Sequence, residues 1–186
     1  AITHAARIIG YIEKEAAARK AAPILGSPFT PPWTTYNIGT IQGGSALNII
    51  ARECSFLWEF RTHPGDDPIA IRDRIARFVE EDVVPKLEAE HPDGAVDTVR
   101  IAAVPMLRPE TDGPAEALAR RLTGANATGV VAFATEGGVF QAAGLSTVVC
   151  GPGDIAQAHQ PDEFISLDQL AQGEAFLRKV ADWAAG

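Results

Sequence analysis

The sequence is poor in sulfur and carries no excess of positive charge. Its 186 residues include two cysteines and a single methionine, Met106. Cys54 and Cys150 each lie in an apolar, strand-like stretch, so we interpret both as reduced thiols of the core; a disulfide is the alternative, but nothing in the sequence requires one. With 16 Lys and Arg against 24 Asp and Glu, the formal net charge is -8. This balance argues against nucleic acid or an anionic membrane as a partner.

Long apolar runs and targeting signals are also missing. No stretch approaches the roughly 20 apolar residues that a membrane-spanning helix needs. The sequence does not open on a basic segment followed by an apolar one, so we see no secretory signal and expect a cytoplasmic location. It begins at Ala1 rather than at methionine, directly in a helical pattern. We therefore interpret the sequence as part of a longer protein.

Residues 1–104 have the pattern of an α+β domain. Hydrophobic periodicity predicts a helix over 1–20, strands over 33–42 and 49–63, a helix from Pro68, and a strand over 96–104. The two adjacent strands are expected to pair antiparallel, joined by a loop around Asn48. Asp67 is expected to cap the second helix, and Pro85 to end or kink it. This order matches a ferredoxin-like β-α-β-β-α-β domain that lacks its first strand.

A change in composition marks a domain boundary near residue 105, and residues 105–186 have the pattern of an α/β unit. The predicted elements are a helix over 114–123, a strand over 129–134, a helix over 137–143, a strand over 146–150, and a helix to about residue 185. Ser166 and Gln169 form a capping box for the last helix. Its apolar face is interpreted as core packing and consists of Leu170, Ala171, Phe176, Leu177, Val180 and Trp183. The fold class is therefore α/β, with an α+β first domain.

His159 is a candidate metal ligand. It follows a predicted buried strand on a loop that contains Gly153, and carboxylates at Asp154, Asp162 and Glu163 can orient its ring. A single histidine in a sequence is more often structural, and one imidazole does not hold a metal ion by itself.

Three further polar residues have a structural and a functional interpretation. Asn48 follows two glycines and either belongs to a hairpin turn or holds a substrate carbonyl or carboxylate. Arg61 either pairs with Glu59 or Glu53 on the polar side of a strand, or binds a substrate carboxylate through two hydrogen bonds. Glu136 either caps a helix or contacts a cationic group of a substrate. Because there is no nucleophile elbow, a Ser-His-Asp hydrolase is a poor fit.

Four segments in this order resemble the metallopeptidase M20 family, most of all its acetylornithine deacetylase branch: residues 41–50, 60–61, 134–138 and 150–163. The resemblance implies an α/β catalytic domain of the zinc-peptidase type with two divalent metal ions, zinc or cobalt. It also implies an inserted lid domain through which the enzyme forms a homodimer. The implied reaction is the hydrolysis of N-acetyl-L-ornithine in arginine biosynthesis, by a metal-bridging water with a glutamate as general base.

The resemblance also assigns residues and domains. His159 matches the last metal ligand, and Asn48, Arg61 and Glu136 match positions that contact the substrate. The other ligands and the general base fall before Ala1, so no catalytic residue is expected in this chain. Residues 1–104 then correspond to an incomplete lid and residues 105–186 to the C-terminal part of the catalytic domain. Alone, the chain is expected to bind no metal pair and to be inactive.

Two alternatives remain. One is another M20 amidohydrolase, such as a succinyl-diaminopimelate desuccinylase, an aminoacylase or a carboxypeptidase. The other is a dimerisation module without catalytic activity.

Overall fold

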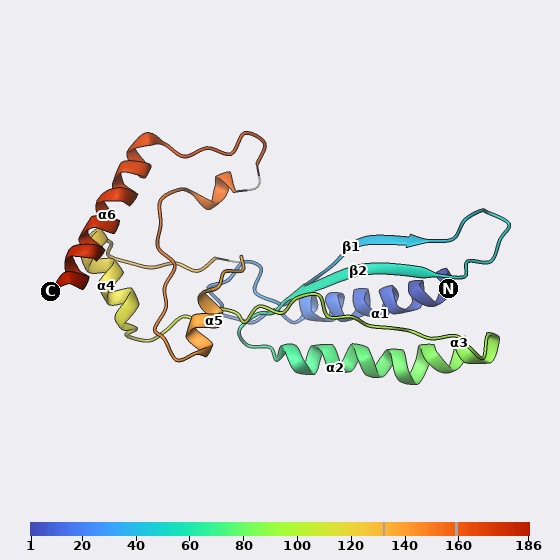
Figure 1. Cartoon of the computed structure of the whole chain (residues 1–186). Helices are drawn as coiled ribbons and strands as arrows, with labels where there is room; N and C mark the ends of the chain where they lie inside the picture. Colours follow the sequence, from blue (N-terminus) through green and yellow to red (C-terminus); the bar gives the residue numbers. More distant parts are fainter. Residues whose placement is uncertain (132, 159) are drawn as a thin grey trace. The chain divides into compact units, whose positions relative to one another are not determined.

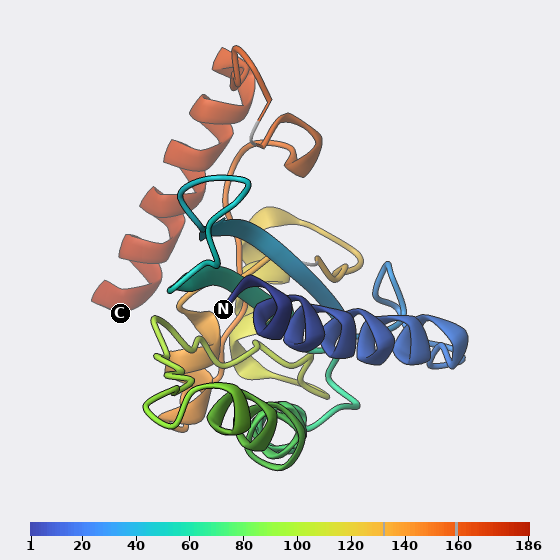
Figure 2. The ribbon, with the colours of Figure 1, turned by 90° about the vertical axis from the view of Figure 1, so that its right-hand side faces the viewer.

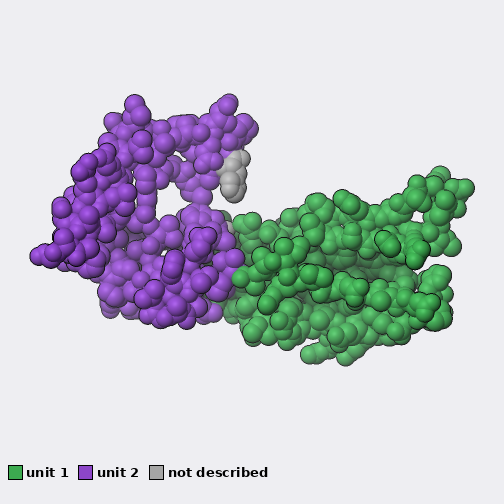
Figure 3. Space-filling model, in the orientation of Figure 1, with its two compact units in different colours: residues 1–103 green, residues 104–186 purple. Residues whose placement is uncertain are grey.

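The structure is a computed structural model that describes residues 1–131, 133–158 and 160–186 (Figure 1). The chain divides into two compact units, unit 1 (Ala1–Ala103) and unit 2 (Val104–Gly186), which have separate colours in Figure 3. Unit 1 contains α1 (Ile2–Ala21), β1 (Thr35–Gly43), β2 (Cys54–Arg61), α2 (Pro68–Phe78), the π-helical turn η1 (Val79–Val83) and α3 (Val84–Glu90). Unit 2 contains α4 (Pro114–Thr123), α5 (Gly137–Ala142), the 3-10 turn η2 (Ile155–Gln157) and α6 (Leu167–Ala185).

The sheet of unit 1 is an antiparallel hairpin. β1 pairs with β2 from Thr35 opposite Arg61 to Gly43 opposite Cys54, which confirms the predicted pairing. A β-bulge between Ile38 and Thr40 inserts one extra residue into β1. The second strand begins five residues later than predicted, because residues 44–53 form a loop instead.

Two helices cover one face of this hairpin. Figures 1 and 2 show α1 and α2 on the same side of the two strands. The buried core consists of Ile8, Ile12, Ile71, Ile75, Val79 and Val83. The strands add partly buried apolar side chains to it: Tyr36, Ile38, Phe56, Trp58 and Phe60. Because side chains alternate along a strand, the intervening residues of both strands point to the other, uncovered face.

The second helix of unit 1 passes through Pro85 instead of ending there. Asp67 accepts a hydrogen bond from the backbone N–H of Ile69, as expected for an N-cap. The π-helical turn Val79–Val83 comes shortly before Pro85, and the helix then continues to Glu90. A wider turn accommodates the proline ring and its missing N–H without breaking the helix.

The three helices predicted for unit 2 are observed close to their predicted positions, but the strands predicted for this unit do not form among its described residues. The hydroxyl of Ser166 accepts a hydrogen bond from the N–H of Gln169 at 3.1 Å and caps α6. The described residues of 129–134 and 146–150 have no strand structure, and neither does the predicted third strand of unit 1, over 96–104. A strand needs a neighbour for its backbone hydrogen bonds, and the only ladder among the described residues joins β1 to β2. The α/β arrangement predicted for the second half is therefore not observed, and the described chain is α+β.

Two further predictions about burial are wrong. No residue of α6 is buried, and Leu170, Leu177 and Trp183 expose 53%, 66% and 55% of their surface. α6 packs against α4, and this contact leaves most of its apolar face uncovered. Both cysteines are free thiols, but Cys150 is exposed and Cys54 only half-buried, so neither is a core residue. Among the described helices, none is both long and apolar enough to cross a membrane.

Candidate functional site

The uncovered face of the hairpin carries a row of polar side chains. Glu59 lies opposite Asn37, and Arg61 opposite Thr35. Residues opposite each other and residues two apart along a strand share a face, so these four side chains lie together. Asn37, Glu59 and Arg61 are exposed, whereas the aromatic side chains that alternate with them on β2 pack against the core.

Among the described residues, Arg61 is paired through one of its three guanidinium nitrogens. Its Nε donates a hydrogen bond to Oε1 of Glu59 at 3.3 Å, and the two side chains are 62% and 53% exposed. An ion pair this exposed contributes at most about 1 kcal/mol to stability. Within the described residues the two Nη nitrogens of Arg61 have no hydrogen bond or ion pair. The predicted pairing with Glu59 is thus observed, and it leaves the guanidinium free to bind a carboxylate.

A buried hydrogen-bond network fixes the end of β2 from which Arg61 projects. The hydroxyl of Thr34 accepts a hydrogen bond from the N–H of His63 at 2.9 Å and donates one to Asp66 at 2.5 Å. Arg19, in α1, donates to the other oxygen of Asp66. Thr34 is fully buried. No local pattern in the sequence indicates this network, because Asp66 is there only the neighbour of the helix cap Asp67.

His63 resembles the base of a serine–histidine pair, but its protonation excludes that role. Its Nδ1 accepts a hydrogen bond from the N–H of Gly65 at 3.0 Å, so the proton of the neutral ring is on Nε2. Nε2 lies 2.8 Å from Oγ of Ser27 and must therefore donate to it. A general base would have to accept the hydroxyl proton instead. Ser27 and His63 thus hold the loop before β1 against the end of β2.

His4 is structural for a similar reason. Its Nδ1 lies 3.2 Å from an Nη nitrogen of Arg7, which can only donate. Its Nε2 then donates to Glu90 at 3.1 Å, and this hydrogen bond is the main reason that the pKa of the Glu90 carboxyl lies below its usual value. The contact joins α1 to the end of α3. In both buried histidines of unit 1 the two ring nitrogens are engaged, so neither is available as a metal ligand.

Asn48 lies in the exposed loop between β1 and β2. Gly44, with a φ of +76°, begins the loop, and the N–H of Ile49 donates to the carbonyl of Ala46 at 3.3 Å. The neighbouring Leu47 and Ile50 are also exposed. Both predicted interpretations of Asn48 fit this position, because the residue belongs to a turn and its amide faces solvent.

Glu136 directly precedes α5 in unit 2. It is exposed and occupies the N-cap position, but its carboxylate makes no hydrogen bond to an N–H of the helix, so a capping role would rest on its charge alone. The two glycines after it are buried and allow the chain at residues 105–107 to approach closely. A Cβ atom on Gly138 would lie only 1.9 Å from the carbonyl oxygen of Pro105. Contacts with Leu107 and Thr135 limit the space at Gly137 in the same way.

A polar cluster in unit 2 surrounds Glu110, and no local pattern in the sequence indicates it. Its carboxylate accepts hydrogen bonds from the hydroxyl of Ser146 at 2.6 Å, the amide of Gln141 at 3.0 Å and the N–H of Thr147 at 3.0 Å. These bonds, with that of Ser146 the most important, lower the pKa of the Glu110 carboxyl. The cluster ties residues 108–110 to the end of α5 and the segment after it. Because these three hydrogen bonds all come from groups of the same unit, we regard Glu110 as structural.

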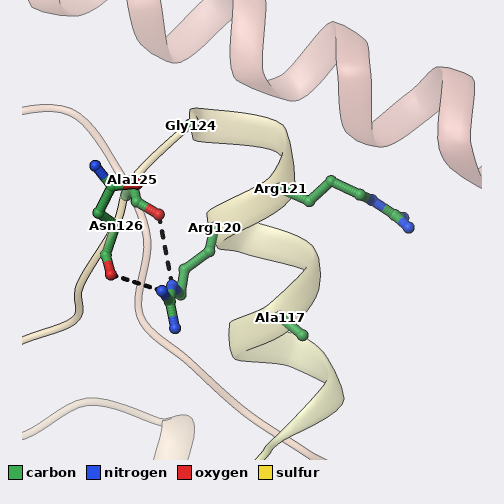
Figure 4. A pocket seen from close by; sticks show the side chains of 6 residues that line it. All are labelled: Ala117, Arg120, Arg121, Gly124, Ala125 and Asn126. Carbon is green, nitrogen blue, oxygen red and sulfur yellow. Dashed lines mark hydrogen bonds between the residues drawn. The ribbon is translucent and has the colours of Figure 1, made fainter.

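An open pocket of about 450 Å³ at the end of α4 does not have the chemistry of an active site (Figure 4). Its lining includes Arg120, which points to the backbone after the helix, and Arg121, which points away from it. Arg120 donates to the carbonyls of Ala125 and Asn126 at 3.4 and 2.6 Å and so satisfies acceptors beyond the helix end. Its described lining residues include no acid and no histidine.

The predicted metal ligand, His159, lies outside the described residues, so its role stays a prediction. Within residues 1–131, 133–158 and 160–186, no group of three or more His, Cys, Asp or Glu residues is placed to hold a metal ion. A catalytic zinc ion takes three protein ligands and a water. The described residues therefore do not fit a dinuclear metal centre by themselves.

Comparison with known proteins identifies the family. Residues 1–86 match the M20 family model described as the peptidase dimerisation domain. An acetylornithine deacetylase of Myxococcus xanthus is 35% identical over 170 residues, which cover 87% of this chain and 41% of the relative. An N-acetyl-L-citrulline deacetylase of Xanthomonas campestris is 33% identical over 135 residues, covering 73% of this chain and 35% of the relative.

An acetylornithine deacetylase of Photorhabdus laumondii is 30% identical over 154 residues, or 83% of this chain and 38% of the relative. The chain thus spans about two fifths of the length of the curated relatives that it matches. These similarities confirm the resemblance seen in the sequence, and the chain belongs to the M20 peptidase family, with acetylornithine deacetylases among its relatives.

Proposed function

We propose that this chain is part of a metal-dependent amidohydrolase that releases acetate from N-acetyl-L-ornithine. The observation that carries the proposal is the exposed guanidinium of Arg61 on the open face of the hairpin, whose two Nη nitrogens have no partner among the described residues. Planar, bidentate binding of a carboxylate is the chemistry to which arginine is best suited. The names of the relatives support an N-acetylated amino acid as the source of that carboxylate.

In this proposal three residues contact the substrate. Arg61 binds the carboxylate, the side-chain amide of Asn48 holds a carbonyl or carboxylate oxygen, and Glu136 contacts the amino end of the ornithine chain. All three are exposed, so none has to break a buried interaction in order to bind. We propose His159 as a ligand to one of two divalent ions, zinc or cobalt. The general-base glutamate and the other ligands would come from the part of the relatives' length that this chain does not span.

We further propose that residues 1–104 are a lid of ferredoxin-like type, through which two copies of the protein form a homodimer. The match of residues 1–86 to a dimerisation domain supports this assignment. Residues 105–186 would be the C-terminal part of the catalytic domain. Because the described residues do not fit a metal centre, we expect the isolated 186-residue chain to hydrolyse no amide.

The relative named as an N-acetyl-L-citrulline deacetylase favours a second candidate substrate, N-acetyl-L-citrulline. This compound has the same carboxylate and acetyl amide, but its side chain ends in a neutral ureido group. The carboxylate-binding role of Arg61 is common to both candidates. Only the residues that meet the end of the side chain distinguish between them.

The test compares turnover by the protein at its natural full length, loaded with zinc or cobalt. We expect kcat/KM for N-acetyl-L-ornithine to exceed kcat/KM for N-succinyl-diaminopimelate, and we expect no turnover by the 186-residue chain alone. A preference for the succinylated compound would indicate another M20 branch. Absence of both bound metal and hydrolysis at full length would contradict the proposal and favour a dimerisation module without catalytic activity.

A further inference from the structure

Glu59 places a negative charge beside the proposed carboxylate-binding arginine. Its Oε1 accepts the hydrogen bond from Nε of Arg61, while Oε2 has no partner in the described part of the chain. An ionised carboxylate has two oxygens and about four acceptor sites. Glu59 can therefore keep its bond to Arg61 and accept further hydrogen bonds from a ligand.

The spacing of the two charges suits a particular kind of ligand. Glu59 and Arg61 are alternate residues of β2 on one face, and their charged groups are in contact, with Nε of Arg61 3.3 Å from Oε1 of Glu59. A ligand that has a carboxylate at one end and an ammonium group at the end of a short aliphatic chain is complementary to this pair. The exposed amide of Asn37, directly opposite Glu59, offers a further polar contact at the same place.

We propose that Glu59 is a positioning and specificity-determining residue that makes this face select N-acyl amino acids with a cationic side chain. It holds the guanidinium of Arg61 by Nε, so that the two Nη nitrogens meet the substrate carboxylate. Its second oxygen accepts a hydrogen bond from the side-chain ammonium, which has three N–H donors. The inference rests on the proposed function and adds that this face of the hairpin contacts the cationic side chain of the substrate.

The charges of the pair also explain which substrates it disfavours. Glu59 and Arg61 together have no net charge, so binding one carboxylate and one ammonium leaves the face neutral. A neutral ureido group gains less from Glu59 than an ammonium does. A second carboxylate, as in a succinylated substrate, would meet repulsion from Glu59.

The test replaces Glu59 with glutamine, which keeps the shape of the side chain and removes its charge. Because Glu59 is exposed, the variant is expected to fold. In the full-length, metal-loaded protein, E59Q should lower the ratio of kcat/KM for N-acetyl-L-ornithine to that for N-acetyl-L-citrulline about fivefold, or about 1 kcal/mol. The loss should appear as a higher KM for N-acetyl-L-ornithine with little change in kcat, as expected when uniform binding is removed.

The matched control is Glu81→Gln, which makes the same change of net charge at an exposed position of η1, on the helical layer. It should leave the ratio as in the wild type. If the wild type hydrolyses both compounds and E59Q has the same ratio as E81Q, the role of Glu59 is overturned while the proposed function stands. If the wild type hydrolyses neither compound, the proposed function is overturned and this inference with it.

Discussion

Replacing Gly138 with alanine is expected to destabilise unit 2 by about 3 kcal/mol, the upper part of the usual range for overpacking. Gly138 lies in α5, where helix propensity alone would favour alanine over glycine by about 1 kcal/mol. The new Cβ would lie 1.9 Å from the carbonyl oxygen of Pro105 and 2.8 Å from the carbonyl carbon of Met106. These are backbone atoms, so relief of the clash requires the chain at residues 105–107 to move. The steric effect therefore outweighs propensity and determines the sign.

Hydrogen exchange of the unit 2 amides measures this change locally. We expect faster exchange in α5 and in the segment around Glu110, whose hydrogen bonds to Gln141 and Ser146 hold it against the end of α5. Gly151→Ala is the matched control, because no heavy atom outside its chain neighbours lies within 4 Å of its Cβ position in the part of the chain that the structure describes. Unchanged or slower exchange in Gly138→Ala would contradict the close approach of the two segments.

The second large effect concerns the core of unit 1. Ile71 is 1% exposed and packs in the cluster between α1, α2 and the hairpin. Ile71→Ala removes buried methyl groups and leaves a cavity, so we expect the free energy of unfolding to fall by about 2–5 kcal/mol. Denaturant unfolding followed by tryptophan fluorescence measures this change, with Trp183→Phe as the background so that the signal comes from Trp33 and from Trp58, which packs on the same cluster.

Ile69 provides the control for this experiment. It lies two residues before Ile71 in the same helix but is 59% exposed. Ile69→Ala deletes the same atoms from a mostly solvated position, and we expect it to cost less than about 1 kcal/mol. Equal effects of the two substitutions would mean that α2 does not turn this face toward the hairpin.

Local sequence signals predicted much of the fold. The alternation in both strands gave their pairing, and the caps at Asp67 and Ser166 located the starts of two helices. The predicted strands that do not form have a strand-like sequence but no strand beside them among the described residues. The segment over 96–104 has strand-like alternation, yet Val99 and Ile101 are 80% and 78% exposed. Alternation of apolar and polar residues indicates a preference for extended backbone, but a strand forms only where another strand supplies its hydrogen bonds. The periodicity of a segment does not show whether such a neighbour is present.

The candidate site was predictable to a similar degree. The pairing of Arg61 with Glu59 follows from their spacing, because residues two apart on a strand share a face. The network of Thr34, Asp66 and Arg19 was not predictable, because it joins residues 32 and 47 positions apart. The same holds for Glu110 and Thr147, which are 37 positions apart. Such contacts depend on the tertiary fold and leave no periodic pattern in the sequence.

The role of Arg61 is tested most directly by kinetics of Arg61→Ala with N-acetyl-L-ornithine, in the full-length protein with its metal ions. Loss of a bidentate, charge-assisted contact of about 2 kcal/mol should lower kcat/KM about 30-fold, mainly through KM. Arg77→Ala, at an exposed position of α2, removes the same charge from the helical layer and should have little effect. If both variants retain the wild-type KM and kcat, the open face of the hairpin does not bind the substrate carboxylate.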